Sequence, residues 1–410
     1  MTNFKFLRIS IVVFFFAGMI SPVAAQEEKT DAITFSGFIK TDFWYDSRLI
    51  AEGREGLVLM YPLPPKTGAD GKDLKAFTSY NFSAMTSRLT AKIKGPDAFG
   101  AKTSGVIEAD YSGVSNTDNN GFRLRHAFVK LNWEKTELLM GNYWHPMFVT
   151  EVFPNVASLN TGAPFQPFNR SPQIAVTRKM GKFNLLAAAI TQRDYPSPGP
   201  AGKIPVYLSN ALVPNMHLQL QYKTEKHVAG VAGDYKFLKP RLTTATGYKT
   251  DEMLGTWAAM AYYKFKTEKF QLKVKGIYGQ NLADQLLLGG YAIATVDTVR
   301  NIETYTPTNN LFCWLNVAYG KKVKAGLFAG YSMNMGTTAE NTGTYYATGA
   351  DIAYMYRIAP NVTVKSGNFE WISEVEYTAA AFGMPDIKGV VQNAELTANY
   401  RLLFTVLYYF

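Results

Sequence analysis

The chain ends on "NYRLLFTVLYYF", residues 399–410, in which at least every second residue is apolar or aromatic. Side chains of a strand alternate between its two faces, so one face of this segment is an unbroken apolar stripe. The segment is too short to cross a membrane as a helix, which requires about 20 apolar residues. We therefore predict a strand whose lipid-facing stripe consists of Tyr400, Leu402, Phe404, Val406, Tyr408 and Phe410.

The same two-residue period recurs along the whole chain. In "ITFSGFIKTDFWYD", residues 33–46, Phe35 and Phe43 share one face, and Lys40 and Asp42 lie on the other. The pattern predicts about 16 strands, at 33–46, 77–94, 101–113, 121–134, 137–145, 173–180, 182–194, 215–224, 227–237, 254–266, 269–281, 310–320, 322–334, 346–358, 361–376 and 392–410.

The predicted connections alternate between tight and long. Short links such as "GPDAFG", and turns near Lys321 and Pro360, alternate with long connections such as 146–172 and 282–309. This alternation is typical of an all-β, antiparallel up-and-down transmembrane barrel with periplasmic turns, extracellular loops and both termini on the turn side. About 16 strands leave an aqueous channel. The last strand is expected to close the barrel against the first, because closure leaves no free edge.

A soluble β-sandwich is the alternative for strands with one apolar face. Strands of ten or more residues are long for a sandwich, where five or six residues are usual. In a membrane barrel, a Lys or Arg that faces lipid near the midplane costs about 2–4 kcal/mol. The apolar faces must therefore point outward and the polar faces inward, and the sequence favours the membrane barrel.

The start of the chain and its composition indicate export. Lys5 and Arg8, the apolar run 9–20 and "PVAA" up to Ala25 predict a cleaved signal peptide at 1–25 and a mature barrel at 26–410. The only cysteine is Cys313, so no intramolecular disulfide bond can form. The net charge of +10 falls to +8 without Lys5 and Arg8. In an exported protein this excess favours anionic solutes, membrane lipid and lipopolysaccharide as partners over nucleic acid.

Three stretches and the terminal Phe410 resemble a known family. The stretches are "GFIKTDFWYDSR" (37–48), "FRLRHAFVKL" (122–131) and "LLMGNYWHPMF" (138–148). Together they resemble the trimeric general porins of Gram-negative bacteria, and most closely the DcaP-like porins. The resemblance implies a homotrimer in the outer membrane, with its interface on the early strands, that admits small hydrophilic solutes. It also implies that Tyr408 and Phe410 are read by the outer-membrane assembly machinery.

In such porins the loop after the fifth strand folds into the lumen and narrows it. Here that loop is 146–172, and the residues expected at the constriction are Glu151, Phe153, Asn160, Phe165, Phe168 and Arg170. DcaP-like members can carry an N-terminal coiled-coil stalk. Only "QEEKTDA" (26–32) separates the predicted cleavage site from the first strand here, so no stalk is expected.

Strand parity predicts which charged side chains line the lumen. The candidates on the early and last strands are Lys40, Asp42, Arg88, Lys92, Glu108, Asp110, Arg123, Arg125 and Arg401, and those elsewhere are Lys223, Lys273, Lys275, Asp351, Glu370 and Glu374. Arg123 and Arg125 lie one pleat apart and form a guanidinium ladder of the kind that sets ion selectivity in pores. Parity then turns His126 and Lys130 outward. His126 is expected at a subunit interface, unless a bulge shifts the register.

The sequence lacks recognisable catalytic motifs. The four histidines, at 126, 145, 217 and 227, lie outside any GxSxG or HExxH motif, and their spacing suggests neither a metal site nor a cofactor. An outer-membrane enzyme and a non-conducting structural barrel or adhesin are the alternatives to a porin. We expect a passive channel with a mild preference for anionic or neutral polar solutes, such as small carboxylates or sugars.

Overall fold

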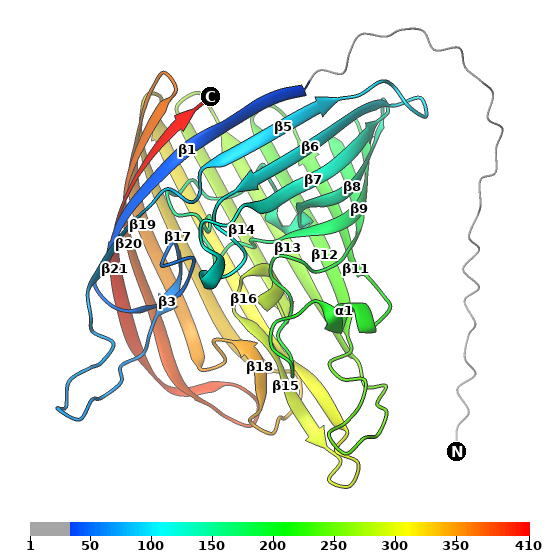
Figure 1. Cartoon of the computed structure of the whole chain (residues 1–410), viewed down its shortest axis with the longest axis vertical. Coiled ribbons are helices and arrows are strands. Elements are labelled where there is room, and N and C mark those ends of the chain that lie inside the picture. The colour runs from blue at the N-terminus through cyan, green and yellow to red at the C-terminus, as the bar shows by residue number, and fades with distance from the viewer. Residues whose placement is uncertain (1–32) are drawn as a thin grey trace.

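The fold is a closed antiparallel barrel of 16 strands (Figure 1). The computed structural model describes residues 33–410, and the predicted signal peptide lies outside them. In wall order the strands are β1 (Ile33–Asp46), β4 (Ser79–Ser83) continued by β5 (Arg88–Lys94), β6 (Lys102–Asp110), β7 (Arg123–Asn132), β8 (Thr136–Trp144), β9 (Arg170–Met180), β10 (Phe183–Ile190), β11 (Asn215–Lys223), β12 (His227–Leu238), β13 (Leu254–Lys266), β14 (Phe270–Gln280), β16 (Glu303–Gly320), β17 (Val323–Thr337), β19 (Ile352–Ser366), β20 (Phe369–Pro385) and β21 (Val391–Tyr409).

The first and last strands close the barrel, as the terminal stripe predicts. β1 pairs with β21 in a register that runs from Phe38 opposite Tyr409 to Asp46 opposite Arg401. The backbone N–H groups of Gly37 and Phe410 each donate to the carbonyl of the other, at 3.1 and 3.2 Å. The last residue therefore completes the seam, and no wall strand is left with a free edge.

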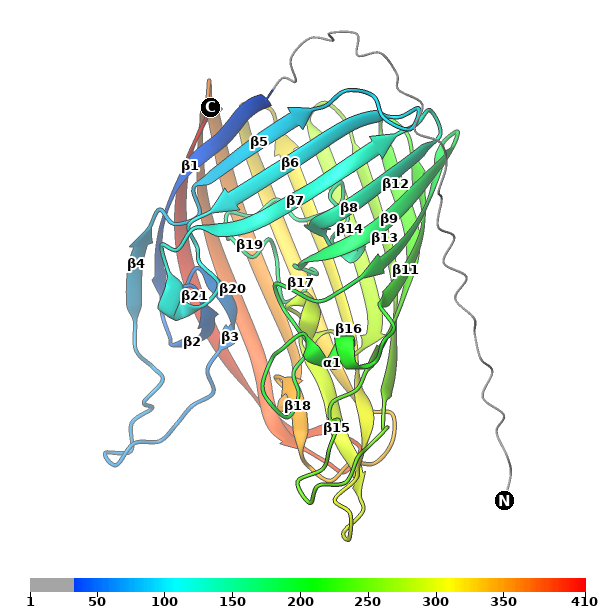
Figure 2. The same cartoon turned by 45° about the vertical axis from the view of Figure 1, so that its right-hand side comes forward.

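The remaining elements belong to the connections. β2 (Ile50–Gly53) and β3 (Val58–Pro62) form a hairpin between β1 and β4, and β15 (Gly289–Val296) pairs with β18 (Tyr345–Thr348) beyond the wall. The short helices are η1 (Asn116–Asp118), η2 (Pro146–Phe148), α1 (Val206–Asn210) and η3 (Ala283–Gln285). The C-terminus lies at one end of the barrel, and α1, β15 and β18 lie toward the other (Figures 1 and 2). Within residues 33–410, no helix has the length and apolar character needed for a membrane span.

The predicted alternation of faces holds along β21. Tyr400 and Phe410 are exposed on the outer surface, at 56% and 54%, whereas Arg401 and Thr405 are buried inside at 1% and 0%. An apolar belt of this kind is what a barrel in lipid requires, because the bilayer core offers no hydrogen-bond partners.

The turn predicted near Pro360 was wrong. β19 continues through Pro360, which lies opposite Leu327 of β17, and the chain turns at Gly367, whose φ is +56°. Toward β20 the pairing skips from Ile358 opposite Tyr377 to Asn361 opposite Glu374. Proline has no N–H for the ladder, so the strand continues past it with an interruption on one side only.

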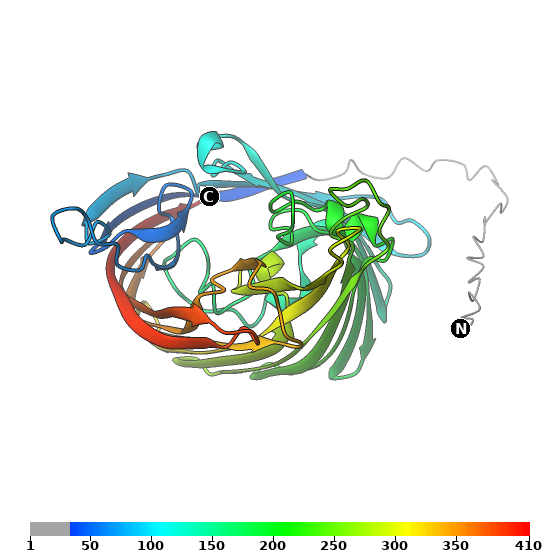
Figure 3. The same cartoon turned by 90° about the horizontal axis from the view of Figure 1, so that it is seen from below.

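The interior is less polar than strand parity predicts. The connection between β8 and β9 contributes Met147, Val152 and Phe165 to a buried apolar cluster with Trp314 of β16 and Phe328 of β17. In Figure 3 ribbons lie within the ring of strands. Some inward positions are apolar because they pack against this connection and not against water.

Candidate pore and its charged interior

The connection between β8 and β9, residues 145–169, is here called the inner segment. Its backbone is hydrogen-bonded to the wall at widely separated points: Lys40 Nζ donates to the Ala157 carbonyl at 3.1 Å, and Lys275 Nζ donates to the Met147 carbonyl at 2.9 Å. The Ala157 N–H donates to Glu374 Oε2 at 3.0 Å. β1 and β20 flank β21, whereas β14 lies farther round the wall, so the inner segment is held at two parts of the interior.

Lys273 contributes a further contact from β14. Its Nζ donates to the Phe153 carbonyl at 2.8 Å and to Asn155 Oδ1 at 2.9 Å. Lys40, Lys273, Lys275 and Glu374, which parity predicts to point inward, all contact the inner segment. These side chains bind the backbone of the inner segment, and their positions in the sequence do not indicate this role.

The six residues expected at a constriction fall into two groups by their contacts. Phe153 stacks on Phe148, which stacks on Trp144 with ring centroids 3.8 Å apart, and Phe168 packs edge-on against Trp144. The other four are engaged as follows: Phe165 packs against Phe328, Asn160 Nδ2 donates to the carbonyls of Leu59 and Ala163, Glu151 pairs with Lys223 of β11, and Arg170 is the first residue of β9.

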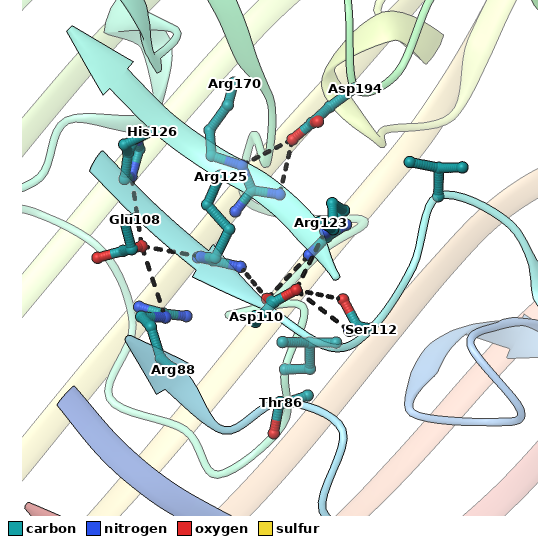
Figure 4. A network of polar contacts seen from close by, with 12 residues as sticks. Thr86, Arg88, Glu108, Asp110, Ser112, Arg123, Arg125, His126, Arg170 and Asp194 are labelled. Carbon is teal, nitrogen blue, oxygen red and sulfur yellow. Dashed lines mark hydrogen bonds and ion pairs between the residues drawn. The ribbon is translucent and has the colours of Figure 1, made fainter. Parts of the chain in front are cut away.

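The predicted arginine ladder lies on the inner wall within a network of carboxylates (Figure 4). Arg123 binds Asp110 through two bonds, Nε to Oδ1 at 3.2 Å and Nη2 to Oδ2 at 3.0 Å. Arg125 bridges Asp110, at 2.7 Å, and Glu108, at 2.9 Å. Arg88 lies 3.5 Å from the same Glu108 oxygen. The ladder is thus largely compensated in charge by the two neighbouring carboxylates of β6.

A fourth arginine extends the network. Arg170 binds Asp194 through Nε and Nη2, at 2.7 and 2.6 Å, and its guanidinium lies 4.8 Å from the centre of the Trp144 ring. Asp194 is the last residue of the predicted strand 182–194, but β10 ends at Ile190 and Asp194 lies in the loop that follows. This acid was not among the predicted inward side chains.

A β-bulge resolves the orientation of His126. The β6–β7 register changes between Glu108, opposite His126, and Ala109, opposite Leu124, which leaves Arg125 as the extra residue. Arg125 and His126 are therefore both buried on the inner side, and His126 Nε2 lies 3.8 Å from Glu108 Oε1. Beyond the bulge the faces are exchanged, and Lys130 is paired with Glu137 at 2.8 Å. The expectation that His126 and Lys130 face outward is wrong, and the bulge alternative is correct.

The other candidates lie near the seam or at strand ends. Lys40 is paired with Asp42 at 2.9 Å, and Arg401 with Asp46 at 2.6 Å. Lys92 is exposed near the end of β5. Asp351 lies in a turn before β19 and not on a strand as predicted.

Two cavities adjoin the inner segment. The first has a volume of about 470 Å³, and the charged side chains along it are Lys40, Arg88, Lys273, Lys324 and Glu370. The second, of about 330 Å³, lies against the β7–β11 side, and its charged side chains are Lys130, Glu137, Glu151 and Lys223. The first cavity thus carries an excess of cations, whereas the second has equal numbers of cations and anions.

No protein-family model and no curated protein matches the sequence. Among solved structures, the outer membrane channel DcaP of Acinetobacter baumannii is similar over 95% of this chain and 100% of that chain, with a TM-score of 0.66 and 18% identity. An anion-selective porin from Comamonas acidovorans is similar over 93% and 100%, with a TM-score of 0.54 and 12% identity. The trimer form of OmpT from Vibrio cholerae is similar over 93% and 100%, with a TM-score of 0.54 and 11% identity. The chain therefore has the porin fold of the outer membrane channel DcaP, in agreement with its DcaP-like sequence stretches.

Proposed function

We propose that this protein is an outer-membrane porin through which small hydrophilic solutes diffuse passively, with a mild preference for anionic or neutral polar ones. The main observation behind it is the first cavity, whose lining between the inner segment and the wall includes four basic side chains and one carboxylate. Lys40 is paired with Asp42 and Arg88 lies 3.5 Å from Glu108, so the remaining excess rests on Lys273 and Lys324 against Glu370. Cations around a narrow, low-dielectric space raise the local concentration of anions. The similar fold of a protein described as an anion-selective porin supports this sign.

The inner segment is assigned the role of constriction. Its backbone is bound by inward side chains of β1 and β20 near the closing seam and of β14 farther round the wall, so it narrows the lumen. The arginine ladder contributes less to selectivity than its sequence suggests, because Glu108 and Asp110 compensate Arg123 and Arg125. The expected preference is accordingly mild, and suits small carboxylates or sugars.

Residues 1–25 are assigned as the export signal, and Tyr408 and Phe410 as the signal for the assembly machinery. Both aromatic residues are exposed on the outer surface of the last strand, at 39% and 54%. They are accessible to a protein that pairs with or inserts this strand.

A homotrimer with its interface on the early strands is part of the proposal. The wall strands are shorter on that side of the barrel. β6, β7 and β8 have 9 or 10 residues, whereas β19, β20 and β21 have 15 to 19. The trimer form of a structurally similar protein supports it. Mass measurement after extraction in mild detergent should give three chains per particle, and a monomer would refute this part.

Planar-bilayer recording tests the channel itself. The purified protein should produce discrete conductance steps, and its reversal potential under a KCl gradient should show a weak preference for chloride. Failure to observe steps in several salts would favour a non-conducting structural barrel. A cation preference would contradict the role given to the first cavity.

A further inference from the structure

Two histidines and an aspartate converge where the inner segment meets the barrel wall. His145 is the first residue of the inner segment, His217 lies on β11, and Asp234 lies on β12. All three are buried, and one ligand atom from each lies within 4.8 Å of the other two. We propose that these residues bind a divalent transition-metal ion, with Zn²⁺ as the ion favoured by a ligand set of two imidazoles and one carboxylate.

Two of the three separations between ligand atoms are close to those around a tetrahedral ion, and the third, between the two imidazole nitrogens, is within 4.8 Å. His217 Nδ1 lies 3.1 Å from Asp234 Oδ2, and His145 Nε2 lies 3.7 Å from the same oxygen. Zn–N and Zn–O bonds of about 2.0–2.2 Å place neighbouring tetrahedral ligand atoms about 3.3–3.6 Å apart. Movement of these side chains toward one another would centre one ion among the three atoms.

The partners of His217 also suit a metal ligand. Its Nε2 lies 3.2 Å from Gln219 Oε1, and Gln219 Nε2 donates to the Tyr262 hydroxyl at 2.7 Å. The hydrogen-bond roles of the His217 ring nitrogens depend on its tautomer. In the tautomer with the proton on Nε2, this nitrogen donates to Gln219 Oε1 and the bare Nδ1 lies 3.1 Å from Asp234 Oδ2. A cation between Nδ1 and the carboxylate removes their repulsion, and a ligand histidine commonly donates its other N–H to an oxygen.

Asn215 supplies a fourth group beside His145. Its side chain is buried at 2% exposure, its Nδ2 lies 3.0 Å from His145 Nε2, and its Oδ1 has no partner. Reversing the amide turns Oδ1 toward the ion position. His145 Nδ1 gives up its long 3.3 Å bond from the Met147 N–H, because a metal on Nε2 leaves the proton on Nδ1.

The surroundings of the cluster give an ion access to it, and the nearby lysine is paired with a carboxylate other than Asp234. His145 and Gln219 line the second cavity, so an ion reaches the site from there. The nearby ammonium of Lys236 is paired with Asp284 and donates to the Asn281 carbonyl at 2.7 Å. Asp234 is thus available to the ion. Bound metal would fasten the start of the inner segment to two wall strands.

The competing arrangement is a closed, ion-free network. If the Gln219 and Asn215 amides are both reversed, His217 Nδ1–H donates to Asp234 and Asn215 Oδ1 accepts from His145 Nε2–H. Both arrangements bring His145, His217 and Asp234 together, and they differ in whether Zn²⁺ is retained.

Metal content of the full-length protein distinguishes them. The purified barrel is stripped with a chelator, incubated with Zn²⁺ and desalted, and zinc is then measured by mass spectrometry. We expect one zinc per chain in the wild type, and a tetrahedral visible absorption band when Co²⁺ replaces Zn²⁺. His217→Ala and Asp234→Asn should each abolish both signals. His145→Gln, which alters a residue outside the strands, should do the same and is the variant least disturbing to the wall.

The control is His227→Ala. His227 also lies on β12, but its Nδ1 is hydrogen-bonded to the Tyr263 hydroxyl at 2.9 Å, away from the cluster, so this variant should retain one zinc. A wild type without zinc overturns the proposal and establishes the ion-free network. Zinc that persists in His217→Ala or His145→Gln also overturns it, because it is then bound elsewhere. The readout is independent of conductance, so it stands or fails separately from the porin function.

Discussion

Arg401 of β21 donates two parallel hydrogen bonds to Asp46 of β1, from Nε to Oδ1 at 2.9 Å and from Nη2 to Oδ2 at 2.6 Å. The two residues lie opposite each other in the closing seam, and both are buried. Arg401 Nη2 also donates to the Gly56 carbonyl at 2.8 Å, in the β2–β3 hairpin. A planar, two-pronged pair fixes the register between the strands, so this contact joins the ends of the barrel and one connection.

Arg401→Ala should destabilise the barrel by about 3–5 kcal/mol, because it leaves Asp46 buried without its partner. Urea unfolding in detergent or lipid, followed by tryptophan fluorescence, measures the change. The control is Lys102→Ala, which removes an exposed pair with Asp97. That variant should change stability by less than about 1 kcal/mol. Equal effects of the two substitutions would contradict the role of the seam pair.

Glu374→Ala should loosen the inner segment and raise the single-channel conductance. Glu374 Oε2 accepts from the Ala157 N–H at 3.0 Å and from Asn361 Nδ2 at 3.1 Å. A buried donor without an acceptor costs about 1–3 kcal/mol, which favours displacement of this part of the segment. Glu370→Ala makes the same substitution at a residue that lines the first cavity and accepts a hydrogen bond from Tyr409. This variant should leave the inner segment in place, and an equal rise in conductance in it would show that the effect does not depend on the contact with Ala157.

Lys324→Gln should weaken the preference for anions. Lys324 lines the first cavity near the start of β17. Removing one of its four cations lowers the positive potential of the lumen. The reversal potential under a KCl gradient should move toward zero. Lys322→Gln changes the same charge in the adjacent turn, outside the lining of the cavity, and should have little effect. If both variants act equally, selectivity is set by the overall charge at that end of the barrel.

Replacing both ladder arginines, Arg123→Ala with Arg125→Ala, should shift the reversal potential toward cations. Glu108 and Asp110 remain and lose the guanidinium groups that now compensate them. The same variant should be less stable, because buried carboxylates without partners are strongly unfavourable. An unchanged reversal potential in a folded variant would show that permeating ions do not pass this wall.

The connection after β3 should lose order in strong acid. The backbone N–H groups of Lys66 and Lys75 and the guanidinium of Arg48 lower the pKa of Asp73 from 3.8 to about 2. A lowered pKa in the folded state stabilises this connection above pH about 4, and the stabilisation is lost as the pH falls toward about 2. Hydrogen exchange of the Lys66 and Lys75 amides, corrected for the intrinsic rate, should show this loss. Asp73→Asn should remove the pH dependence, and a pH dependence that persists in that variant would rule out the carboxylate.

Much of the fold could be predicted because each wall strand of a membrane barrel alternates outward apolar residues with inward polar ones. Phe35 and Phe43 on one face and Lys40 and Asp42 on the other are enough to orient β1, since lipid and interior demand opposite side chains. Phe410 likewise predicted closure, which its pairing with Gly37 confirms. Pro360 misled the prediction, because one missing hydrogen bond can mark either a turn or a tolerated gap in a long strand.

The sequence by itself determined the barrel, the orientation of its faces and most of the inward charges, because each depends on a local two-residue period. Only the tertiary structure decided what those charges contact. The bulge at Arg125 exchanges the faces of β7, and the Arg170–Asp194 pair and the His145–His217–Asp234 cluster join residues from separate elements. These contacts depend on the register between strands and on the path of the inner segment. Neither the register nor the path of the inner segment produces a periodic pattern in the sequence.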